Sequence, residues 1–501
     1  MRHERHPRGG GFTRGLAFSL AASVLSGGCR AGEPSFPLSA EELALSSLKL
    51  TVSGEKLLDA RGREVLLRGV NAGGRSKLAP FFPFAFRESG LASQAKAPPF
   101  DEAARAYLDR VKAWGVNVLR VPFSWEAVEP ERGRYDELFL ARFRRLCELC
   151  GERGLRVIVD FHQDAFARPY CGDGFPLWAC TQPVPETPAD CSEWFSAYLD
   201  QSSPASRAFD RFWADEDGLH EAFRQMWRRV ARALWPVASV VGFEVMNEPH
   251  AGSATRPGWD EQVLRPFYEA TARAIREEAP GAPVFFDPPG LDGATVSTQL
   301  RPPAGAGFVF APHYYSVGAF IPGLTTSPAK ILADLGRWAA QGATWKLPVF
   351  VGEFGIAPTA DKAASYMRAH YDAFDAHALH GAQWEYSTTE DRWNAEAMSV
   401  TGPGGVETAL VAELARPFPR AVAGTLVRFT YDATARRAEL VYDARAEGIT
   451  ELALPARTYP TGADLTLSGV DGAAFRIDGG AVFVYAPTAG RLTVSLRPAA
   501  R

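Results

Sequence analysis

Eight short apolar runs alternate with amphipathic stretches over residues 65–384 of this chain. The runs are four to seven residues long, as is typical of strands buried on both faces, and lie at 65–71, 116–122, 155–161, 240–246, 283–286, 308–311, 348–352 and 381–384. Segments with the helical period separate most of them, at 101–114, 136–153, 217–235, 260–279, 328–342 and 360–378. Eight such strand–helix steps predict an α/β fold, the TIM (β/α)8 barrel. No Gly-x-Gly-x-x-Gly sequence follows the first strand, which disfavours a doubly wound sheet.

The pattern changes after about residue 420 and no longer shows a helical period. Short alternating runs, separated by Gly, Pro and Asp, lie at 426–431, 438–442, 451–454, 475–477, 481–485 and 492–496. We therefore expect a barrel domain at 48–415 and a small C-terminal antiparallel β-sandwich at 420–501. A chain of 501 residues is long enough for both.

The N-terminal residues 1–30 have the pattern of an export signal. Four arginines precede an apolar segment at 16–25, and small residues at 26–28 precede Cys29. The apolar segment is too short to span a bilayer comfortably. Cys29 after two glycines resembles a bacterial lipoprotein cleavage site, but simple secretion and a retained anchor are alternatives. We expect an exported protein, secreted or lipid-anchored at the bacterial cell envelope.

The other cysteines are Cys147, Cys150, Cys171, Cys180 and Cys191. The first two lie three residues apart on a predicted helix, but no second Cys or His pair stands at zinc-finger spacing. The last three fall in a long insertion at 162–216, where an exported protein is expected to form a disulfide. The sequence leaves the pairing open, and an odd number leaves at least one thiol unpaired.

Charge and aromatic content limit the classes of ligand. A formal net charge of −4, without a long basic run in the predicted domains, argues against nucleic acid as a partner. Twelve Trp and 32 Phe provide faces that suit sugar rings and lipid chains, although most are expected in the core.

Two glutamates follow predicted strands, Glu248 after the fourth apolar run and Glu353 after the seventh. In a barrel of this type the residues after the strands gather at one face. Two carboxylates there are the minimum for cleaving a glycosidic bond, because one donates a proton and the other attacks or supports the sugar carbon. The alternative is that both are ordinary solvated carboxylates.

Further polar and aromatic side chains lie at or after the ends of the predicted strands, and Arg120 lies within the second. They are Asn71, Lys77, Arg120, His162, Gln163, Asp164, Asn247, His313, Tyr315 and Trp384. Each has a structural alternative: Arg120 could form a buried ion pair, the histidines could be core residues, and Trp384 could be packing. Their common place at one face of the barrel favours a binding site.

The Asn247-Glu248-Pro249 and Gly352-Glu353-Phe354-Gly355 motifs, each after its strand, resemble those of glycoside hydrolase family 5. The resemblance covers about residues 48–400. It implies a retaining barrel glycosidase in which Glu248 is the acid/base and Glu353 the nucleophile.

The same resemblance implies roles for the surrounding side chains. Asn247 would hold the sugar 2-hydroxyl, and Arg120 and Tyr315 would keep Glu353 ionised and aimed. His162 and His313 would line the subsite, with Trp384 as the sugar platform.

A narrower resemblance is to the endoglycoceramidases and related lipid-glycoside hydrolases. Three segments carry it: Gly69-Val70-Asn71 with Lys77, residues 160–164 (DFHQD), and residues 172–179 (GDGFPLWA). It implies that Lys77 and Asp164 hold hydroxyls of the sugar next to the lipid. A C-terminal β-sandwich is also shared.

Two apolar loops on the expected active face also suggest a lipid aglycone. Residues 80–86 contain Phe81, Phe82, Phe84 and Phe86, and a second loop spans 320–324. Water-facing loops rarely need so many large apolar groups. We expect contact with lipid or a membrane surface, and packing over the helices is the alternative.

The sequence therefore predicts a monomeric retaining β-glycosidase that hydrolyses a glycolipid, without metal or organic cofactor. The alternatives are an endo-acting polysaccharide β-glycanase (glucanase or mannanase type) and an exo-β-glucosidase acting on steryl or ceramide glucosides. A non-catalytic carbohydrate- or lipid-binding protein would not need both glutamates.

Overall fold

The computed structural model describes residue 36 and residues 48–500, apart from 193, 255–257, 321–323 and 389–396. The predicted export segment, with Cys29, lies outside these residues, as does most of the apolar loop at 320–324. Within the described part of the chain, no helix is both long enough and apolar enough to cross a membrane.

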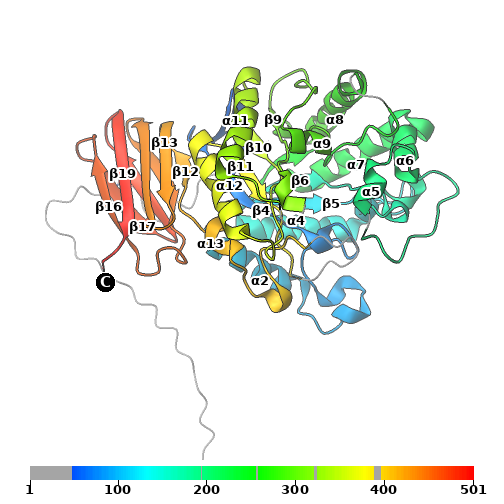
Figure 1. Ribbon diagram of the computed structural model, residues 1–501, viewed down its shortest axis with the longest axis horizontal. Helices are drawn as coiled ribbons and strands as arrows, with labels where there is room; N and C mark the ends of the chain where they lie inside the picture. Colours follow the sequence, from blue (N-terminus) through cyan, green and yellow to red (C-terminus); the bar gives the residue numbers. More distant parts are fainter. Residues whose placement is uncertain are drawn as a thin grey trace, which may run out of the picture. The chain divides into compact units, whose positions relative to one another are not determined.

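Eight parallel strands form the first domain, in the order β10-β11-β4-β5-β6-β7-β8-β9 (Figure 1). Their bounds are β4 Arg68–Asn71, β5 Val118–Phe123, β6 Arg156–Phe161, β7 Val240–Glu244, β8 Val284–Phe286, β9 Phe308–Phe310, β10 Phe350–Val351 and β11 His380–Gln383. A parallel bridge between Phe310 and Val349 joins the two edges and closes the barrel. The predicted fold is confirmed, because each of the eight apolar runs overlaps a barrel strand.

The helices of this domain follow the strands and lie outside the barrel (Figure 1). The long ones are α2 Phe100–Ala113, α4 Glu137–Gly151, α7 Leu219–Leu234, α8 Arg265–Glu278, α11 Pro328–Trp345 and α12 Ala363–His377. The short ones are α3 Trp125–Val128, α5 Trp194–Leu199, α6 Pro204–Trp213, α9 Gly290–Thr295, α10 Val317–Phe320 and α13 Leu410–Leu414. Apolar side chains repeat at helical spacing, so each long helix buries one face against the strands.

The C-terminal residues form two antiparallel sheets. One has the order β13-β14-β19-β16 and the other β1-β2-β3-β12-β15-β18-β17. The C-terminal strands are β12 Pro419–Val422, β13 Gly424–Asp432, β14 Arg437–Ala444, β15 Gly448–Ala453, β16 Ala463–Ser468, β17 Ala474–Asp478, β18 Ala481–Ala486 and β19 Gly490–Pro498. The predicted sandwich is confirmed, although the alternating pattern did not reveal β12 or β16.

Three strands from the start of the chain complete the larger sheet: β1 Leu50–Ser53, β2 Lys56–Asp59 and β3 Glu64–Val65. Val65 pairs with Ala421 of β12, so segments far apart in sequence share one sheet. Leu50 and Leu57 pack in one apolar cluster with inward-facing barrel residues such as Ile158. The β1–β2 hairpin thus covers the N-terminal end of the barrel core.

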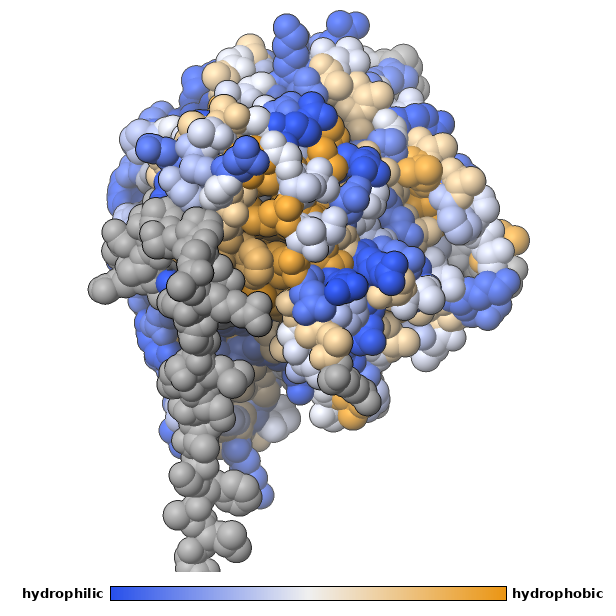
Figure 2. Space-filling model, turned by 90° about the vertical axis from the view of Figure 1, so that its left-hand side faces the viewer, coloured by the Kyte–Doolittle hydropathy of each residue, from blue (hydrophilic) through white to orange (hydrophobic). Residues whose placement is uncertain are grey.

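Figure 2 shows the side of the molecule that carries the sandwich, where apolar residues gather in the middle and hydrophilic ones surround them. Strand β17 is an edge of the larger sheet, and its Phe475 and Ile477 remain 43% exposed. They pair in register with Val484 and Val482, which are fully buried. Directly paired residues point to the same face, so these two side chains face the sandwich core but are only partly covered.

Three of the four phenylalanines of the loop at 80–86 are core residues, contrary to the prediction that they contact lipid, and Phe81 is partly buried against the same core. Phe82, Phe84 and Phe86 are at most 3% exposed. Their rings pack on one another and on Phe100 at the start of α2, with centroid distances of 5.0–6.2 Å. The loop folds back over α2 and α4 because such packing removes the large aromatic surfaces from water.

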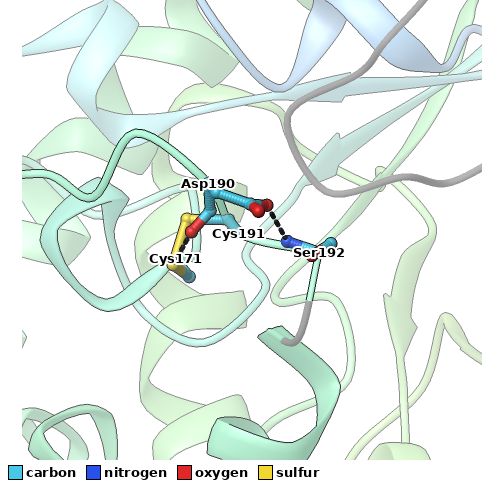
Figure 3. Close-up of a disulfide and its surroundings, with 4 residues drawn as sticks. All are labelled: Cys171, Asp190, Cys191 and Ser192. Carbon is cyan, nitrogen blue, oxygen red and sulfur yellow. Dashed lines mark hydrogen bonds between the residues drawn. A yellow bond between two sulfur atoms is a disulfide. The ribbon is translucent and has the colours of Figure 1, made fainter.

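A disulfide joins Cys171 to Cys191 within the insertion after β6 (Figure 3). It closes a loop of 20 residues, and the backbone N–H of Ser192 donates to the side chain of Asp190 beside it. The prediction of a disulfide in this loop is confirmed. Cys147, Cys150 and Cys180 are buried free thiols.

Candidate active site

Glu248 follows β7 and Glu353 follows β10, at the C-terminal ends of their strands. One carboxylate oxygen of each, together with a ring nitrogen of His313, lie within 4.8 Å of one another. Retaining glycosidases place their carboxyl groups about 5–5.5 Å apart, whereas inverting ones need roughly 6.5–9.5 Å to admit water. The pair therefore has the close spacing that a direct attack on the sugar requires.

Arg120 of β5 is fully buried at the centre of this site. Its Nη1 donates to Glu353 Oε1 at 2.9 Å, and its Nη2 donates to Asn247 Oδ1 at 2.8 Å. Glu244 accepts two hydrogen bonds from the same guanidinium, at 2.7 and 3.0 Å, and Asp160 lies 3.1 Å from Nη2. A buried guanidinium needs such partners, and its rigid fork fixes Glu353 and Asn247 relative to each other.

Glu353 is held as an anion by its neighbours. The Tyr315 hydroxyl donates to Oε2 at 3.0 Å, and His313 Nδ1 lies 3.6 Å from the same oxygen. Burial acts to raise the pKa of Glu353, but the positive charges of His313 and Arg120 outweigh it and hold the pKa below its ordinary value. An ionised, aimed carboxylate is what a nucleophile requires.

Glu248 sits in an unusual backbone conformation, with a φ of 37°. Its Oε1 lies 2.7 Å from His313 Nδ1, and its backbone N–H donates to Asp287 Oδ2 at 2.9 Å. Gly290, at the start of α9, leaves room for the carboxylate, because a Cβ there would lie 2.6 Å from Glu248 Oε2. The Glu248 carboxylate is thereby directed at the space beside Glu353.

A second polar cluster adjoins the pair and contains Lys77, His162, Asp164 and Trp384, whereas Asn71 accepts a hydrogen bond from Arg120 Nη1 at 2.9 Å. Lys77 contacts Asp164, and His162 lies between Asp160 at 2.8 Å and Asp164 at 3.4 Å. The His162 ring stacks on Trp384, with centroids 5.3 Å apart and planes 13° from parallel. The structure thus brings all the predicted site residues together at the C-terminal end of the barrel.

The charges of this cluster stabilise one another. Burial acts to lower the pKa of His162, but Asp160 and Asp164 raise it to about 10. Burial acts to raise the pKa of Asp164, but Lys77 and His162 outweigh it and hold the pKa well below its ordinary value. The cluster therefore offers a charged carboxylate and an ammonium as hydrogen-bonding partners for hydroxyl groups.

Three carboxylates of the site were missed in the sequence: Asp160, Glu244 and Asp287. Asp160 and Glu244 lie within apolar strand runs and are fully buried, and Asp287 directly follows β8. The sequence did contain a signal for Asp160 and Glu244, because a carboxylate inside a buried strand needs a buried cation as its partner. Arg120, on the strand beside Asp160, is that cation.

Histidine and carboxylate groups approach closely enough here to hold a metal ion in principle. Among the described residues they already have positive partners: Lys77 contacts Asp164, and Arg120 contacts Glu244 and Glu353. The retaining reaction needs only the two carboxyl groups.

A cavity of about 1140 Å³ lies elsewhere, between the N-terminal end of the barrel and the larger sheet of the sandwich. Arg156, Arg420 and Glu451 are among the residues that line it, and none of the predicted site residues does. The close approach of Glu248 and Glu353, rather than cavity size, marks the candidate active site.

A barrel with two close carboxyl groups at the ends of its fourth and seventh strands is the arrangement of a glycoside hydrolase. The sequence matches the family described as cellulase (glycosyl hydrolase family 5) over residues 84–390, and the family 5 C-terminal domain over residues 416–495. The chain belongs to glycoside hydrolase family 5.

Several endoglycoceramidases are similar to this chain over most of its length. An endoglycoceramidase from Cyanea nozakii is 24% identical over 80% of this chain and 83% of its own length. Endoglycoceramidase I from Rhodococcus hoagii is 26% identical over 89% of this chain and 85% of its own. The structure of endo-glycoceramidase II from a Rhodococcus species, in complex with ganglioside GM3, covers 89% of this chain and 100% of its own, with 27% identity and a TM-score of 0.73. The same protein has also been described as a lactosyl-enzyme intermediate.

Proposed function

We propose that this protein is a retaining β-glycosidase that hydrolyses the bond between a sugar and a lipid, in the manner of an endoglycoceramidase. The observation that carries the proposal is the close Glu248–Glu353 pair beside the Lys77–Asp164 contact. The similar endoglycoceramidases and the ganglioside complex support a glycolipid substrate.

In the first step Glu353 attacks the anomeric carbon while protonated Glu248 donates its proton to the leaving oxygen. Arg120 and Tyr315 each hold one oxygen of Glu353, so the attacking carboxylate is already oriented. The sugar becomes bound to Glu353, and the aglycone leaves as an alcohol.

In the second step Glu248, now a carboxylate, takes a proton from water, and this water releases the sugar from Glu353. Asn247 is held by Arg120 and by its own donation to the Gln163 carbonyl oxygen at 3.1 Å. It is placed to meet the sugar 2-hydroxyl beside the reacting carbon.

The sugar lies on the side of Lys77, Asp164 and His162, with Trp384 as its platform. A carboxylate and an ammonium in contact can share hydroxyl groups of one sugar, since the first accepts and the second donates hydrogen bonds. These residues would hold the sugar next to the lipid, whereas a polysaccharide glycanase would need an open row of aromatic platforms.

The aglycone leaves past Glu248, and Leu291 lies on that side. It follows Gly290, where a Cβ would meet the Glu248 carboxylate, and is 50% exposed. Leu291, rather than the buried phenylalanines of residues 80–86, is our candidate for contact with lipid. We also propose that the protein works as a monomer and that the loop at 320–324, where Leu324 is 50% exposed, touches the membrane surface.

Replacing Leu291 with serine is expected to lower kcat/KM for a glycosylceramide by roughly four- to tenfold, because full burial of a leucine is worth about 1.5–3 kcal/mol and half is already buried here. A water-soluble aryl β-glycoside should be hydrolysed at nearly the wild-type rate. Steady-state assays on both substrates at fixed detergent measure the difference.

Phe82→Ser is the matched control, since it removes an apolar side chain that is 2% exposed. It should lower the melting temperature and reduce both activities alike. If Phe82→Ser selectively lost glycolipid hydrolysis and Leu291→Ser did not, the lipid would contact the loop at 80–86 rather than Leu291.

One substrate panel tests the proposed function. Glucosylceramide, a longer glycosphingolipid, a steryl glucoside and carboxymethylcellulose are each incubated with the protein. We expect release of the intact glycan from the sphingolipids. Hydrolysis of carboxymethylcellulose alone would establish a polysaccharide glycanase instead, and release of glucose from the steryl glucoside alone would establish an exo-glucosidase.

We propose further that residues 1–30 export the protein and that it is secreted or lipid-anchored through Cys29 at the bacterial cell envelope. The support is the basic, apolar and small-residue order that precedes Cys29. Mass spectrometry of the mature N-terminus distinguishes a lipidated Cys29 from a simple cleavage and from a retained segment.

A further inference from the structure

Asp287 is a buried carboxylate that the two chemical steps do not use. It follows β8 and is 1% exposed. Its Oδ2 accepts the backbone N–H of Glu248 at 2.9 Å and lies 3.3 Å from His313 Nε2. The other ring nitrogen of His313 is 2.7 Å from the Glu248 carboxylate. Asp287 therefore acts on Glu248 by two routes. The backbone route is its hydrogen bond with the N–H of Glu248, and the imidazole route runs through His313.

The backbone route fixes a conformation that glutamate rarely adopts. The φ of Glu248 is 37°, and residues other than glycine are uncommon at positive φ. Besides Asp287, the side chain of Gln163 supports this turn by donating to the carbonyl oxygens of Asn247 and Glu248, each at 2.9 Å. Strained backbone of this kind persists only where its surroundings hold it.

The imidazole route concerns charge. Among the residues that the structure describes, three carboxylates lie within 3.6 Å of the His313 ring: Glu248 at 2.7 Å, Asp287 at 3.3 Å and Glu353 at 3.6 Å. Glu244 also lies within 4.8 Å of it, but both its oxygens accept hydrogen bonds from Arg120. Burial acts to lower the pKa of His313, and Asp287 and Glu353 raise it to about 10.

Two of these three carboxylates change charge during a double displacement. Glu353 loses its charge when the sugar is attached, and Glu248 alternates between the acid and the carboxylate. Asp287 takes part in neither change. Burial raises the pKa of Asp287 well above its ordinary value, against the opposing charge of His313, so the Asp287 carboxylate and the His313 imidazolium keep their charges only as a pair. Asp287 is the neighbour that can keep a buried imidazole protonated when the charge of Glu353 disappears.

We propose that Asp287 is a positioning residue of the general acid/base: it holds the Glu248 backbone in place and keeps His313 as an imidazolium beside the Glu248 carboxylate throughout the reaction. This inference rests on the proposed retaining mechanism. The imidazolium donates its Nδ1 hydrogen to Glu248 Oε1, which leaves the other oxygen to exchange the proton with the leaving group and with water.

Asp287→Asn separates the two routes, because an asparagine oxygen can still accept the Glu248 N–H while the charge beside His313 is lost. We expect kcat/KM to fall about 100-fold for an alkyl or lipid β-glycoside, which needs proton donation. For a 2,4-dinitrophenyl β-glycoside, whose leaving group needs no proton, we expect glycosylation of the enzyme to slow by less than about threefold.

Asp334→Asn is the matched control: this buried carboxylate accepts from the Tyr314 hydroxyl, Lys330 and Arg337. In Asp334→Asn, the relative rates on the alkyl and the 2,4-dinitrophenyl β-glycoside should be the same as in the wild type. Equal losses of Asp287→Asn on both substrates, or no loss on either, would overturn the inference. If the wild type hydrolyses no β-glycoside at all, the proposed function fails instead.

A direct measurement does not depend on activity. In protein labelled with ¹⁵N-histidine, the His313 signal is assigned by its absence from His313→Gln. We expect His313 to be doubly protonated at neutral pH in the wild type, both free and with Glu353 trapped by a 2-deoxy-2-fluoro glycoside. In trapped Asp287→Asn it should be neutral. A neutral His313 in the trapped wild type, or a charged one in the trapped variant, contradicts the proposal.

Discussion

Glu353→Gln is expected to abolish turnover, by about 10⁴-fold or more, on glycolipids and activated aryl glycosides alike. The amide cannot form the bond to the sugar, and no other group at the site can replace it. The fold should survive, because Arg120 keeps Glu244 and Asp160 as buried partners. Initial rates on a 2,4-dinitrophenyl β-glycoside, with melting curves, measure both quantities.

Azide should not restore activity to Glu353→Gln through a product of retained configuration. Glu131→Gln is a suitable control. In the described part of the chain, the exposed Glu131 side chain forms its ion pair and hydrogen bonds only with Arg134. Substantial activity of Glu353→Gln on the activated substrate would show that Glu353 is not the nucleophile.

Glu248→Ala should behave differently because only the proton transfers are lost. Hydrolysis of a glycolipid is expected to fall by about 10²–10⁴-fold. With a 2,4-dinitrophenyl leaving group the variant should still form the glycosyl-enzyme, which then accumulates because no group activates water. A burst of dinitrophenol followed by slow turnover is the expected time course.

Azide should accelerate the slow phase of Glu248→Ala, since the small anion fits the space left by the side chain and needs no base. The product should be a β-glycosyl azide, identified by NMR. If Glu248→Ala and Glu353→Gln gave the same time courses, and azide helped neither, the assignment of the two roles would be wrong.

The barrel and the positions of the two glutamates could be predicted because their signals are local. A strand buried on both faces gives a continuous apolar run, and the residue after it lies at the catalytic end of a barrel. The positions of Glu248 and Glu353 therefore follow from the pattern, and Arg120 is found as a charged residue within a buried strand. The predicted glycoside hydrolase family is confirmed by the match over residues 84–390.

The missed features depend on contacts that the local pattern does not contain. The phenylalanines of residues 80–86 resemble an exposed apolar loop until α2 and α4 are placed against them. The contacts of Asp287 with Glu248 and His313 exist only in the folded barrel, where β8 and β9 lie side by side. Likewise β12 is short, and its partner β3 lies at the other end of the chain.

The pairing of β3 with β12 bears on how the protein is made. Residues 64–65 leave the ribosome about 350 residues before residues 419–422 are synthesised, which at 5–20 residues per second is a wait of roughly 20–70 seconds. During this time β3, which pairs with the hairpin over the N-terminal end of the barrel, has an unpaired edge, and such edges invite association with other chains. A messenger RNA truncated before the codon for residue 419 would therefore yield a barrel whose N-terminal end is covered by an incomplete sheet. We expect such a chain to aggregate and to depend on chaperones.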